Sequence, residues 1–318
     1  MTTGLFIGGE WGSAVMRLYL CRADGDGVTL IETVTGGGVV GCDDFEAAFF
    51  AAAQPWFDTH GPLPVILAGM IGSNIGWRDS GYVDAPAGVA EIATRLTSLR
   101  VRGVDIHFTP GLKCRNLFGQ PDLIRGEEMQ VLGLLDDEPA AQRLICLPGR
   151  HTKWMLTEAG RITSFTTSMY GELNDLLLGH GLLGKGVNRA AWSDDAFDAG
   201  LDIVVSKGPA FGHAVFATRG RLVLGEHTAD DAAAFLGGVT IGCDVRDILE
   251  ALDRRHPSKL EVLILGHDST VEHYARAFDR LGVPHTLVTL PALAAKGLGG
   301  ILEAAQHRQA EAHHTQLS

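Results

Sequence analysis

The sequence predicts an α/β fold of two similar domains with a cleft between them, and two strand-rich stretches carry most of that prediction. The stretch Leu144–Phe165 reads as three short strands separated by polar, glycine-containing turns. The start of the chain repeats this pattern, with strand Leu5–Gly9, turn Glu10–Ser13 and strand Met16–Arg22. Strands then alternate with helical patterns after each stretch. Since 318 residues are enough for two hydrophobic cores, we expect two α/β domains.

Hydrophobic periodicity and turn signals predict the remaining elements of the first half. Gly25–Gly27 makes a hairpin into a third strand, Val28–Val34, and Asp43 or Asp44 caps the first helix. The expected elements that follow are helix Asp43–Trp56, strand Pro64–Ala68, helix Gly88–Leu99, strand Val104–Phe108 and helix Glu127–Leu135. A junction is expected at Asp136–Pro139, which would divide the chain into domains 1–140 and 141–306.

The second half continues as alternating helices and strands after its opening meander. The expected elements are helix Leu173–Gly179, helix Asp194–Ser206, an irregular crossover Ala210–Gly225, helix Thr228–Asp253, strand Leu260–Leu265, helix Val271–Leu281, strand Thr286–Thr289 and helix Pro291–Gln306. Residues 307–318 are polar, and we expect a frayed tail.

The amino-acid composition limits the kinds of molecule that this protein is expected to bind. The formal net charge of −12 argues against nucleic acid, whose phosphates need a basic surface. Five scattered cysteines without a CxxC motif indicate reduced thiols and a cytoplasmic protein. The longest apolar run, Leu63–Ile71, is too short to cross a bilayer, and no secretory leader opens the chain. The 13 histidines show no close ligand spacing, so a small-molecule substrate without a transition metal is expected.

Two glycine-bearing turns could hold nucleotide phosphates. Gly12 and Ser13 lie in the first, and Gly149–Thr152 form the second, with Lys153 as a point charge beside it. Backbone N–H groups must approach phosphates closely, which favours glycine. Each turn alone is as well explained by an ordinary hairpin, but their matched positions in the two halves favour a paired phosphate site. P-loop and Rossmann patterns are not found in the sequence.

Several carboxylates could take part in phosphoryl transfer. Glu127 and Glu128 open a helix beside Arg125, where one of them could accept a hydroxyl proton. The alternative is that both only complement the positive end of the helix dipole. Glu10 ends an apolar strand, where a glutamate that holds a cation is expected, and Glu172 is a further candidate acid.

The loop after strand Pro64–Ala68 could bind a sugar or sugar acid. Asn74 offers hydrogen-bond donors and acceptors to hydroxyls, Trp77 could stack on a ring, and Arg78 could pair with a carboxylate. Ser73 adds a hydroxyl. An ordinary surface loop is the alternative.

These motifs together resemble the 2-dehydro-3-deoxygalactonokinase family, within the sugar-kinase/Hsp70/actin superfamily, from Phe6 to about Leu302. The matching stretches are Trp11–Ser13 with Arg17, Ala68–Trp77, Pro110–Leu112, Arg125–Gly133, the Pro148–Trp154 turn, Gly171–Gly184, Ala234–Gly242 and the loop at Gly266. The RGEE and PGxHxKW motifs are the most specific of these.

The resemblance implies two actin-like (ribonuclease H-like) domains around a cleft, and an ATP- and Mg²⁺-dependent kinase. Its implied reaction is phosphorylation of 2-dehydro-3-deoxy-D-galactonate at the 6-hydroxyl in galactonate catabolism. The implied partners are therefore a small sugar acid and ATP, without nucleic acid or membrane, and a homodimer is left open. The resemblance implies these nucleotide-binding residues: Gly12, Ser13, Gly149, Arg150, His151, Thr152, Lys153, Gly237, Gly238, Gly242 and Gly266. It implies that the substrate is bound by Ser73, Asn74, Trp77, Arg125 and Glu172. The implied catalytic residues are Glu127, Glu128 and Arg17, and the implied metal ligand is Glu10.

Three positions depart from the family pattern and keep alternatives open. Glu10 replaces an aspartate, Ala14 a hydroxyl residue, and Arg150 a small hydroxyl residue. The Arg150 guanidinium either reaches the nucleotide phosphates or fills the space that the terminal phosphate needs, and we expect the second. The alternatives to the kinase are a homologue that binds a sugar acid but transfers phosphate weakly, and a kinase for another keto-deoxy sugar acid.

Overall fold

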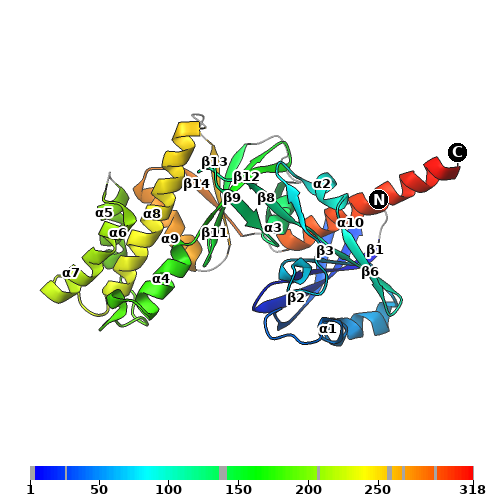
Figure 1. Ribbon diagram of the computed structural model, residues 1–318, viewed down its shortest axis with the longest axis horizontal. Coiled ribbons are helices and arrows are strands. Elements are labelled where there is room, and N and C mark those ends of the chain that lie inside the picture. The colour runs from blue at the N-terminus through cyan, green and yellow to red at the C-terminus, as the bar shows by residue number, and fades with distance from the viewer. Residues whose placement is uncertain are drawn as a thin grey trace.

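The computed structural model describes residues 4–25, 27–135, 142–205, 208–255, 260–266, 269–289 and 292–317, and for residues 205, 254, 255 and 312–317 it describes the backbone alone (Figure 1). Two main sheets with helices packed against them confirm the predicted α/β class. The predicted junction Asp136–Pro139 lies outside the described residues.

The first sheet has the strand order β3-β2-β1-β4-β7-β6. Its strands are β1 (Gly4–Trp11), β2 (Val15–Asp24), β3 (Gly27–Gly37), β4 (Val65–Ala68), β6 (Thr97–Val101) and β7 (Val104–Phe108). The meander is confirmed: β1 pairs antiparallel with β2 and parallel with β4. Alternating apolar residues of these strands form one face of the sheet, and α1 (Phe45–His60) packs against that face. Asp44, rather than Asp43, caps this helix by accepting the N–H of Ala47 at 2.9 Å.

The second sheet has the order β12-β11-β10-β13-β14. Its strands are β10 (Arg143–Leu147), β11 (Thr152–Glu158), β12 (Arg161–Ser168), β13 (Glu261–Leu265) and β14 (His285–Val288). Helices α5, α8 and α9 cover the face turned away from the first sheet (Figure 1). The helices of this half are α4 (Tyr170–Gly179), α5 (Asp194–Val205), α6 (Phe211–Ala214), α7 (Phe216–Leu224), α8 (Ala232–Arg255) and α9 (Ser269–Arg280), with the 3-10 turn η2 (Leu182–Gly184).

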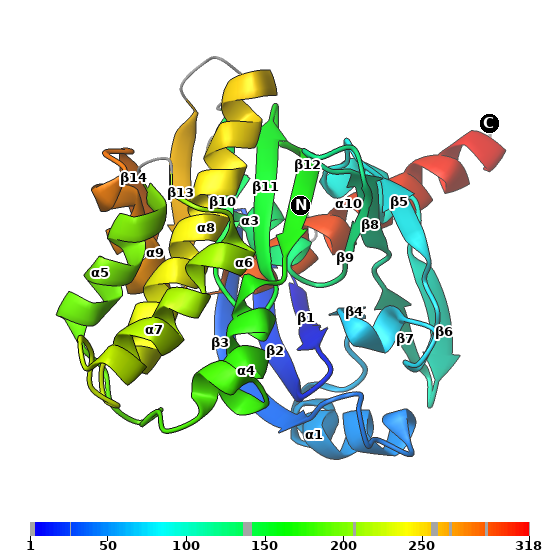
Figure 2. The same cartoon turned by 60° about the vertical axis from the view of Figure 1, so that its left-hand side comes forward.

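The last helix, α10 (Leu293–Leu317), returns to the first half of the chain and packs against α2 (Val89–Ala93), α3 (Glu128–Leu135) and β1 (Figure 2). Two glycines allow a close crossing of α3 and α10. A Cβ on Gly133 would lie 1.9 Å from the Leu293 carbonyl oxygen, and one on Gly297 would lie 2.2 Å from that of Met129. The start of α3, where the candidate bases Glu127 and Glu128 lie just before and at its first residue, is therefore held against a helix from the other end of the chain.

A third, small sheet joins the two halves. Its strands are β5 (Tyr82–Asp84), β8 (Gly111–Arg115) and β9 (Pro121–Ile124), and β8 and β9 contact β12, the edge strand of the second sheet. The Asp122 carboxylate accepts hydrogen bonds from the backbone N–H and the hydroxyl of Thr167, each at 2.8 Å. The Cys114 thiol donates to the Phe165 carbonyl. The edge of β12 is thus covered by the first half of the chain.

Three expectations about elements were wrong. The predicted helix Gly88–Leu99 ends at Ala93, and strand β6 follows because Thr97–Val101 pairs antiparallel with β7. The predicted irregular segment Ala210–Gly225 contains α6 and α7, which pack on α8. The last helix extends to Leu317 instead of ending near Gln306.

Candidate active site

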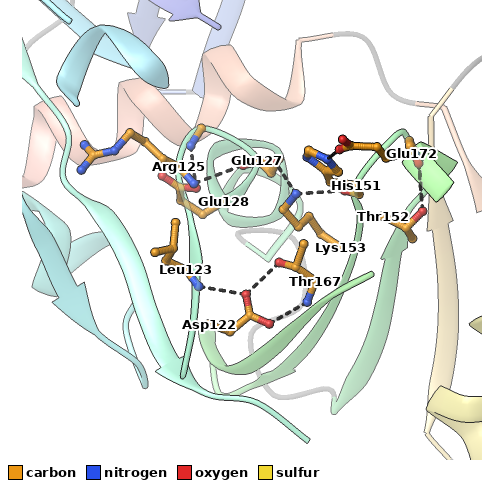
Figure 3. Close-up of polar contacts among 12 residues, drawn as sticks. Asp122, Leu123, Arg125, Glu127, Glu128, His151, Thr152, Lys153, Thr167 and Glu172 are labelled. Atoms are coloured by element: carbon orange, nitrogen blue, oxygen red, sulfur yellow. Dashed lines mark hydrogen bonds and ion pairs between the residues drawn. The ribbon is translucent and has the colours of Figure 1, made fainter. Parts of the chain in front are cut away.

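The predicted base and the predicted second phosphate turn meet between the two halves (Figure 3). Strand β9 leads through Arg125, Gly126 and Glu127 into α3, and Glu127, the residue just before this helix, faces β11 of the second sheet. The Glu127 Oε1 atom lies 3.0 Å from the Lys153 Nζ atom, and its Oε2 accepts the backbone N–H of Arg125 at 3.2 Å. Lys153 also donates to the His151 carbonyl at 2.9 Å. An ion pair therefore joins the helix start of one half to the phosphate turn of the other.

The neighbouring Glu128 points into the protein. Its side chain is fully buried, and its Oε2 accepts the backbone N–H of Gly126 at 2.7 Å, whereas Oε1 has no partner among the described residues. Burial, with a contribution from the adjacent Glu127, raises the pKa of Glu128 to about 7. Glu127 is 37% exposed, so it is the better placed of the two to reach a substrate hydroxyl.

The second phosphate turn is held from both sides. The Thr152 hydroxyl oxygen lies 3.3 Å from the Gly149 backbone nitrogen inside the turn. Outside it, His151 is hydrogen-bonded to Glu172 of α4, which lowers the pKa of that carboxyl group. Arg150 is exposed and lies 3.9 Å from Glu172 and 3.8 Å from Asp175. The predicted substrate ligand Glu172 is therefore placed beside the phosphate turn, and its contact with substrate stays a prediction.

Glu10 lies at the first turn, in a cavity of about 280 Å³ between the halves. Arg17, Tyr19 and Gln130 line it from the first half, and Gly266 with Thr289 from the second. The Tyr19 hydroxyl donates to Glu10 Oε2 at 2.6 Å. Burial, followed by the nearby Glu10 carboxylate, raises the pKa of Tyr19. His267 and Asp268, next to Gly266, lie outside the described residues.

The donor set around Glu10 fits Mg²⁺ in one respect. This ion needs only one or two carboxylates when substrate phosphates and water complete its shell. Glu10 supplies one partly buried carboxylate in the cavity that both halves line. Among the described residues there is no cluster of three or more His, Cys, Asp or Glu side chains that could hold a metal ion alone. With the described residues alone, Glu10 would need substrate phosphates and water to complete an Mg²⁺ shell.

The predicted sugar-acid loop follows β4 through a 3-10 turn, η1 (Met70–Gly72). Arg125 holds this loop in place by donating hydrogen bonds to the carbonyl oxygens of Gly72 at 2.6 Å and Gly81 at 2.8 Å. Ser73 is buried and donates to the Met70 carbonyl, and the Trp77 ring packs against aromatic rings of the first core. Asn74 is exposed. Arg125, Ser73 and Trp77 thus shape the loop, and Asn74 is the member best placed to contact a ligand.

A larger cavity of about 460 Å³ lies next to the phosphate turn in the second half. This cavity is lined by three of the predicted nucleotide-binding residues, Gly149, Arg150 and Gly237. It is also lined by Trp192 and His273, whose rings stack with centroids 4.2 Å apart. Trp192 and His273 were missed by the sequence analysis, because no local motif links positions so far apart in the chain.

The two other glycines of α8 have a different environment. A Cβ on Gly238 would lie 2.0 Å from the Phe197 carbonyl oxygen of α5, and one on Gly242 would lie 2.5 Å from Val204 Cγ2. These glycines let α8 and α5 pack closely, and any contact of theirs with a nucleotide stays a prediction. Gly12 and Ser13, which were predicted to bind phosphates, lie in the turn between β1 and β2, and that role stays a prediction.

Comparison with known proteins defines the class and then the family. The structure has the actin-like ATPase fold: an activator of 2-hydroxyisocaproyl-CoA dehydratase from Clostridium difficile superposes with a TM-score of 0.50 at 12% identity, over 96% of this chain and 98% of that one. The fold and the kinase family that the chain matches together define this protein as a sugar-acid kinase. The chain belongs to the 2-keto-3-deoxy-galactonokinase family, whose model matches residues 10–301.

Two relatives agree with this family. The 2-dehydro-3-deoxygalactonokinase of Escherichia coli is 32% identical over 286 residues, which are 90% of this chain and 93% of that protein. A solved structure from Sinorhizobium meliloti, provisionally assigned to the same activity, is 28% identical and has a TM-score of 0.77 over 95% of this chain and 98% of that one. Within the described residues, no helix is long and apolar enough to cross a membrane.

Proposed function

We propose that this chain transfers the terminal phosphoryl group of ATP to the 6-hydroxyl of 2-dehydro-3-deoxy-D-galactonate, as a step of galactonate catabolism. The observation that carries the proposal is the 3.0 Å contact between Glu127 and Lys153. It puts a carboxylate of the first half directly beside a cation of the phosphate turn, where an acceptor hydroxyl and a terminal phosphate must meet.

Each residue of the site has its own role in this reaction. Glu127 accepts the proton of the 6-hydroxyl as that oxygen forms its bond to the terminal phosphorus, and the bond from this phosphorus to the bridging oxygen breaks to release ADP. Lys153 and the backbone N–H groups of Gly149–Thr152 bind the phosphate oxygens. Glu10 would hold Mg²⁺, which neutralises phosphate charge when bound. Asn74 would bond a hydroxyl of the sugar acid.

We also propose a domain division near residue 140, with residues 1–140 as the core of the first unit. Helix α10 (Leu293–Leu317) packs on α3 and β1, which supports assigning it to this first unit, so that the second unit would run from residue 141 to the start of α10 rather than to 306. We propose a cytoplasmic location, which the scattered cysteines without a CxxC motif support. A homodimer is a hypothesis that light scattering of the purified chain tests.

The test is coupled ADP release with 2-dehydro-3-deoxy-D-galactonate and with its C4 epimer as acceptors. The parent chain is expected to turn over the first acceptor faster. Glu127→Gln is expected to lower kcat by about two to four orders of magnitude, the range of general-base loss. Glu46→Gln is the control, because Glu46 pairs with Arg102 at an exposed site outside the Glu127–Lys153 region. Near-full turnover in Glu127→Gln would move the base to Glu128 or Glu172, and no ADP release from the parent chain with either acceptor would refute the proposed reaction.

A further inference from the structure

A buried chain of hydrogen bonds runs from the second phosphate turn into the core behind it. The Tyr274 hydroxyl of α9 donates to Asp244 Oδ2 of α8 at 2.6 Å, and it lies 2.8 Å from the Thr152 hydroxyl. Trp154 Nε1 donates to the second oxygen of Asp244 at 3.1 Å. These groups come from β11, α8 and α9, so three elements of the second half meet behind the turn.

The direction of the chain follows from its end point. A buried carboxylate that receives hydrogen bonds from Tyr274, Trp154 and Ser168 is an acceptor, so the single hydroxyl proton of Tyr274 is committed to Asp244. The Thr152 hydroxyl lies 2.8 Å from the Tyr274 oxygen and 3.2 Å from the Gly149 carbonyl oxygen, and the shorter contact takes its proton. The Thr152 oxygen is then left to accept the backbone N–H of Gly149 at 3.3 Å. The order is therefore Gly149 N–H, Thr152, Tyr274, Asp244, and each member fixes the orientation of the one before it.

Burial makes this arrangement rigid. Thr152 is 0% exposed, and Tyr274 and Asp244 are each 2% exposed. Burial also raises the pKa of Asp244 to about 7, although hydrogen bonds from Tyr274, Ser168 and Trp154 lower it. A buried polar chain is costly unless every member is satisfied, and a satisfied one holds its elements in a single arrangement.

The same elements form the wall of the 460 Å³ cavity. Tyr274 lines this cavity, and Gly237 and Thr240 line it from α8, two turns or less before Asp244. Gly149 and Arg150 line it from the turn. The hydrogen-bonded chain thus fixes the turn relative to the wall that would receive the rest of a nucleotide.

We infer that Asp244 and Tyr274 are positioning residues for nucleotide phosphates: through Thr152 they hold the Gly149–Thr152 backbone in the conformation that binds them. This inference rests on the proposed function. Neither side chain needs to touch the phosphates, because each acts through the turn.

The test removes single hydroxyl groups and compares two ligands. Tyr274→Phe and Thr152→Val each remove one hydroxyl group and keep the side-chain shape, so each breaks the chain of hydrogen bonds. Thr152→Ser keeps the hydroxyl group at position 152. Isothermal titration measures the Kd of Mg-ATP and of adenosine, which lacks phosphates. We expect Mg-ATP binding to weaken by up to about tenfold in the first two variants, the effect of one buried hydrogen bond, with adenosine binding unchanged and Thr152→Ser close to the parent.

A double variant shows whether the groups act as one chain. Thr152→Val with Tyr274→Phe is expected to weaken Mg-ATP binding no more than the stronger single change, because either change already breaks the chain. Asp198→Asn is the control: Asp198 binds Arg276 of α9 at 2.7 Å, two residues from Tyr274, without a link to the turn, and it should leave both affinities unchanged.

Three results would overturn the inference. Equal losses for Mg-ATP and adenosine, at any thermal stability, would show that the chain supports the cavity as a whole rather than the turn. Unchanged Mg-ATP binding in the variants, beside a parent that binds it, would refute the positioning role and leave the proposed function standing. A parent that binds no Mg-ATP would refute both. If Tyr274→Phe does not fold, the comparison of Thr152→Val with Thr152→Ser decides.

Discussion

Arg150 lies beside two carboxylates of α4 in the structure, and its role toward the nucleotide stays a prediction. From the sequence alone we expected its bulk to occupy phosphate space. In the structure the guanidinium lies between Glu172 and Asp175 of α4, at 3.9 and 3.8 Å, and is largely exposed. It can therefore screen two carboxylates from nucleotide phosphates.

We expect Arg150→Thr to raise the KM for ATP by less than about tenfold, because exposed ion pairs contribute about 1 kcal/mol or less. Coupled ADP release at varied ATP measures the effect, with Arg150→Lys as the variant that keeps the charge and should stay near the parent. Faster turnover in Arg150→Thr, alone or with Glu10→Asp, would instead support the expectation that the arginine obstructs the terminal phosphate.

Glu128 provides a pH-dependent prediction at the same scale. Its folded pKa of about 7 lies above the usual value of a glutamate, so between about pH 4.5 and 7 the folded state holds a proton that the unfolded state releases. The free energy of unfolding contributed by this group therefore falls as pH rises through that window. Glu128→Gln, which stays neutral, should be more stable than the parent at pH 8 by up to about 3 kcal/mol and lose this advantage near pH 4.5.

Thermal unfolding of the parent and of Glu128→Gln at pH 5 and pH 8 measures this difference. Glu261→Gln serves as the control, since Glu261 is about half exposed and pairs with Arg143 away from α3. A constant difference between Glu128→Gln and the parent at both pH values would show that the carboxyl group does not titrate as its burial requires.

At the scale of elements, the crossing of α3 and α10 sets the position of both candidate bases. A methyl group on Gly297 would lie 2.2 Å from the Met129 carbonyl oxygen, so Gly297→Ala must push the helices apart. We expect a loss of about 1–3 kcal/mol in stability and a lower kcat, because α3 carries Glu128 and follows Glu127 directly.

Gly220→Ala is the matched control for this change. Gly220 lies in α7, and a Cβ there meets nothing within 4 Å, so alanine should leave stability the same or raise it by up to about 1 kcal/mol. Thermal unfolding and kcat of both variants provide the comparison. A Gly297→Ala chain as stable and as fast as the parent would mean that the two helices can separate without cost.

The elements also show what a sequence can predict. Local patterns were sufficient for the two meanders and for a helix cap at Asp43 or Asp44, of which the structure uses Asp44, because strand alternation and capping depend on neighbouring residues. They were insufficient for β6 and for the third sheet, because Thr97–Val101 is a strand only through its pairing with β7, and β9 docks on β12 some 40 residues later.

The candidate site divides in the same way. The glycine turns and the RGEE segment were recognisable as motifs, and the structure brings Glu127 and Lys153 together. The stacked Trp192 and His273, and the chain from Thr152 to Asp244, depend on contacts between distant segments. No spacing in the sequence indicates them.

At the scale of the whole molecule, the third sheet couples the two halves beside the candidate site. Asp122 binds Thr167 of β12 through both carboxylate oxygens, and β9, which contains Asp122, leads directly to Arg125 and Glu127 (Figure 3). Thr167 in turn pairs with Lys153 across β11 and β12. The two residues of the interdomain ion pair are thus each connected to the Asp122–Thr167 contact by a short stretch of strand.

This connection predicts that each substrate strengthens the binding of the other, and that the effect depends on Asp122. We expect Asp122→Ala to lower stability by about 1–2 kcal/mol, because two part-buried donors of Thr167 lose their acceptor, and to reduce the factor by which sugar acid tightens Mg-ATP binding. Ser164→Ala is the matched control, because the contact of the Ser164 hydroxyl with the Arg115 carbonyl at the same seam is long, at 3.5 Å. Titration of Mg-ATP with and without sugar acid measures the factor in all three chains. An unchanged factor in a folded Asp122→Ala variant would mean that the two halves communicate through the ligands alone.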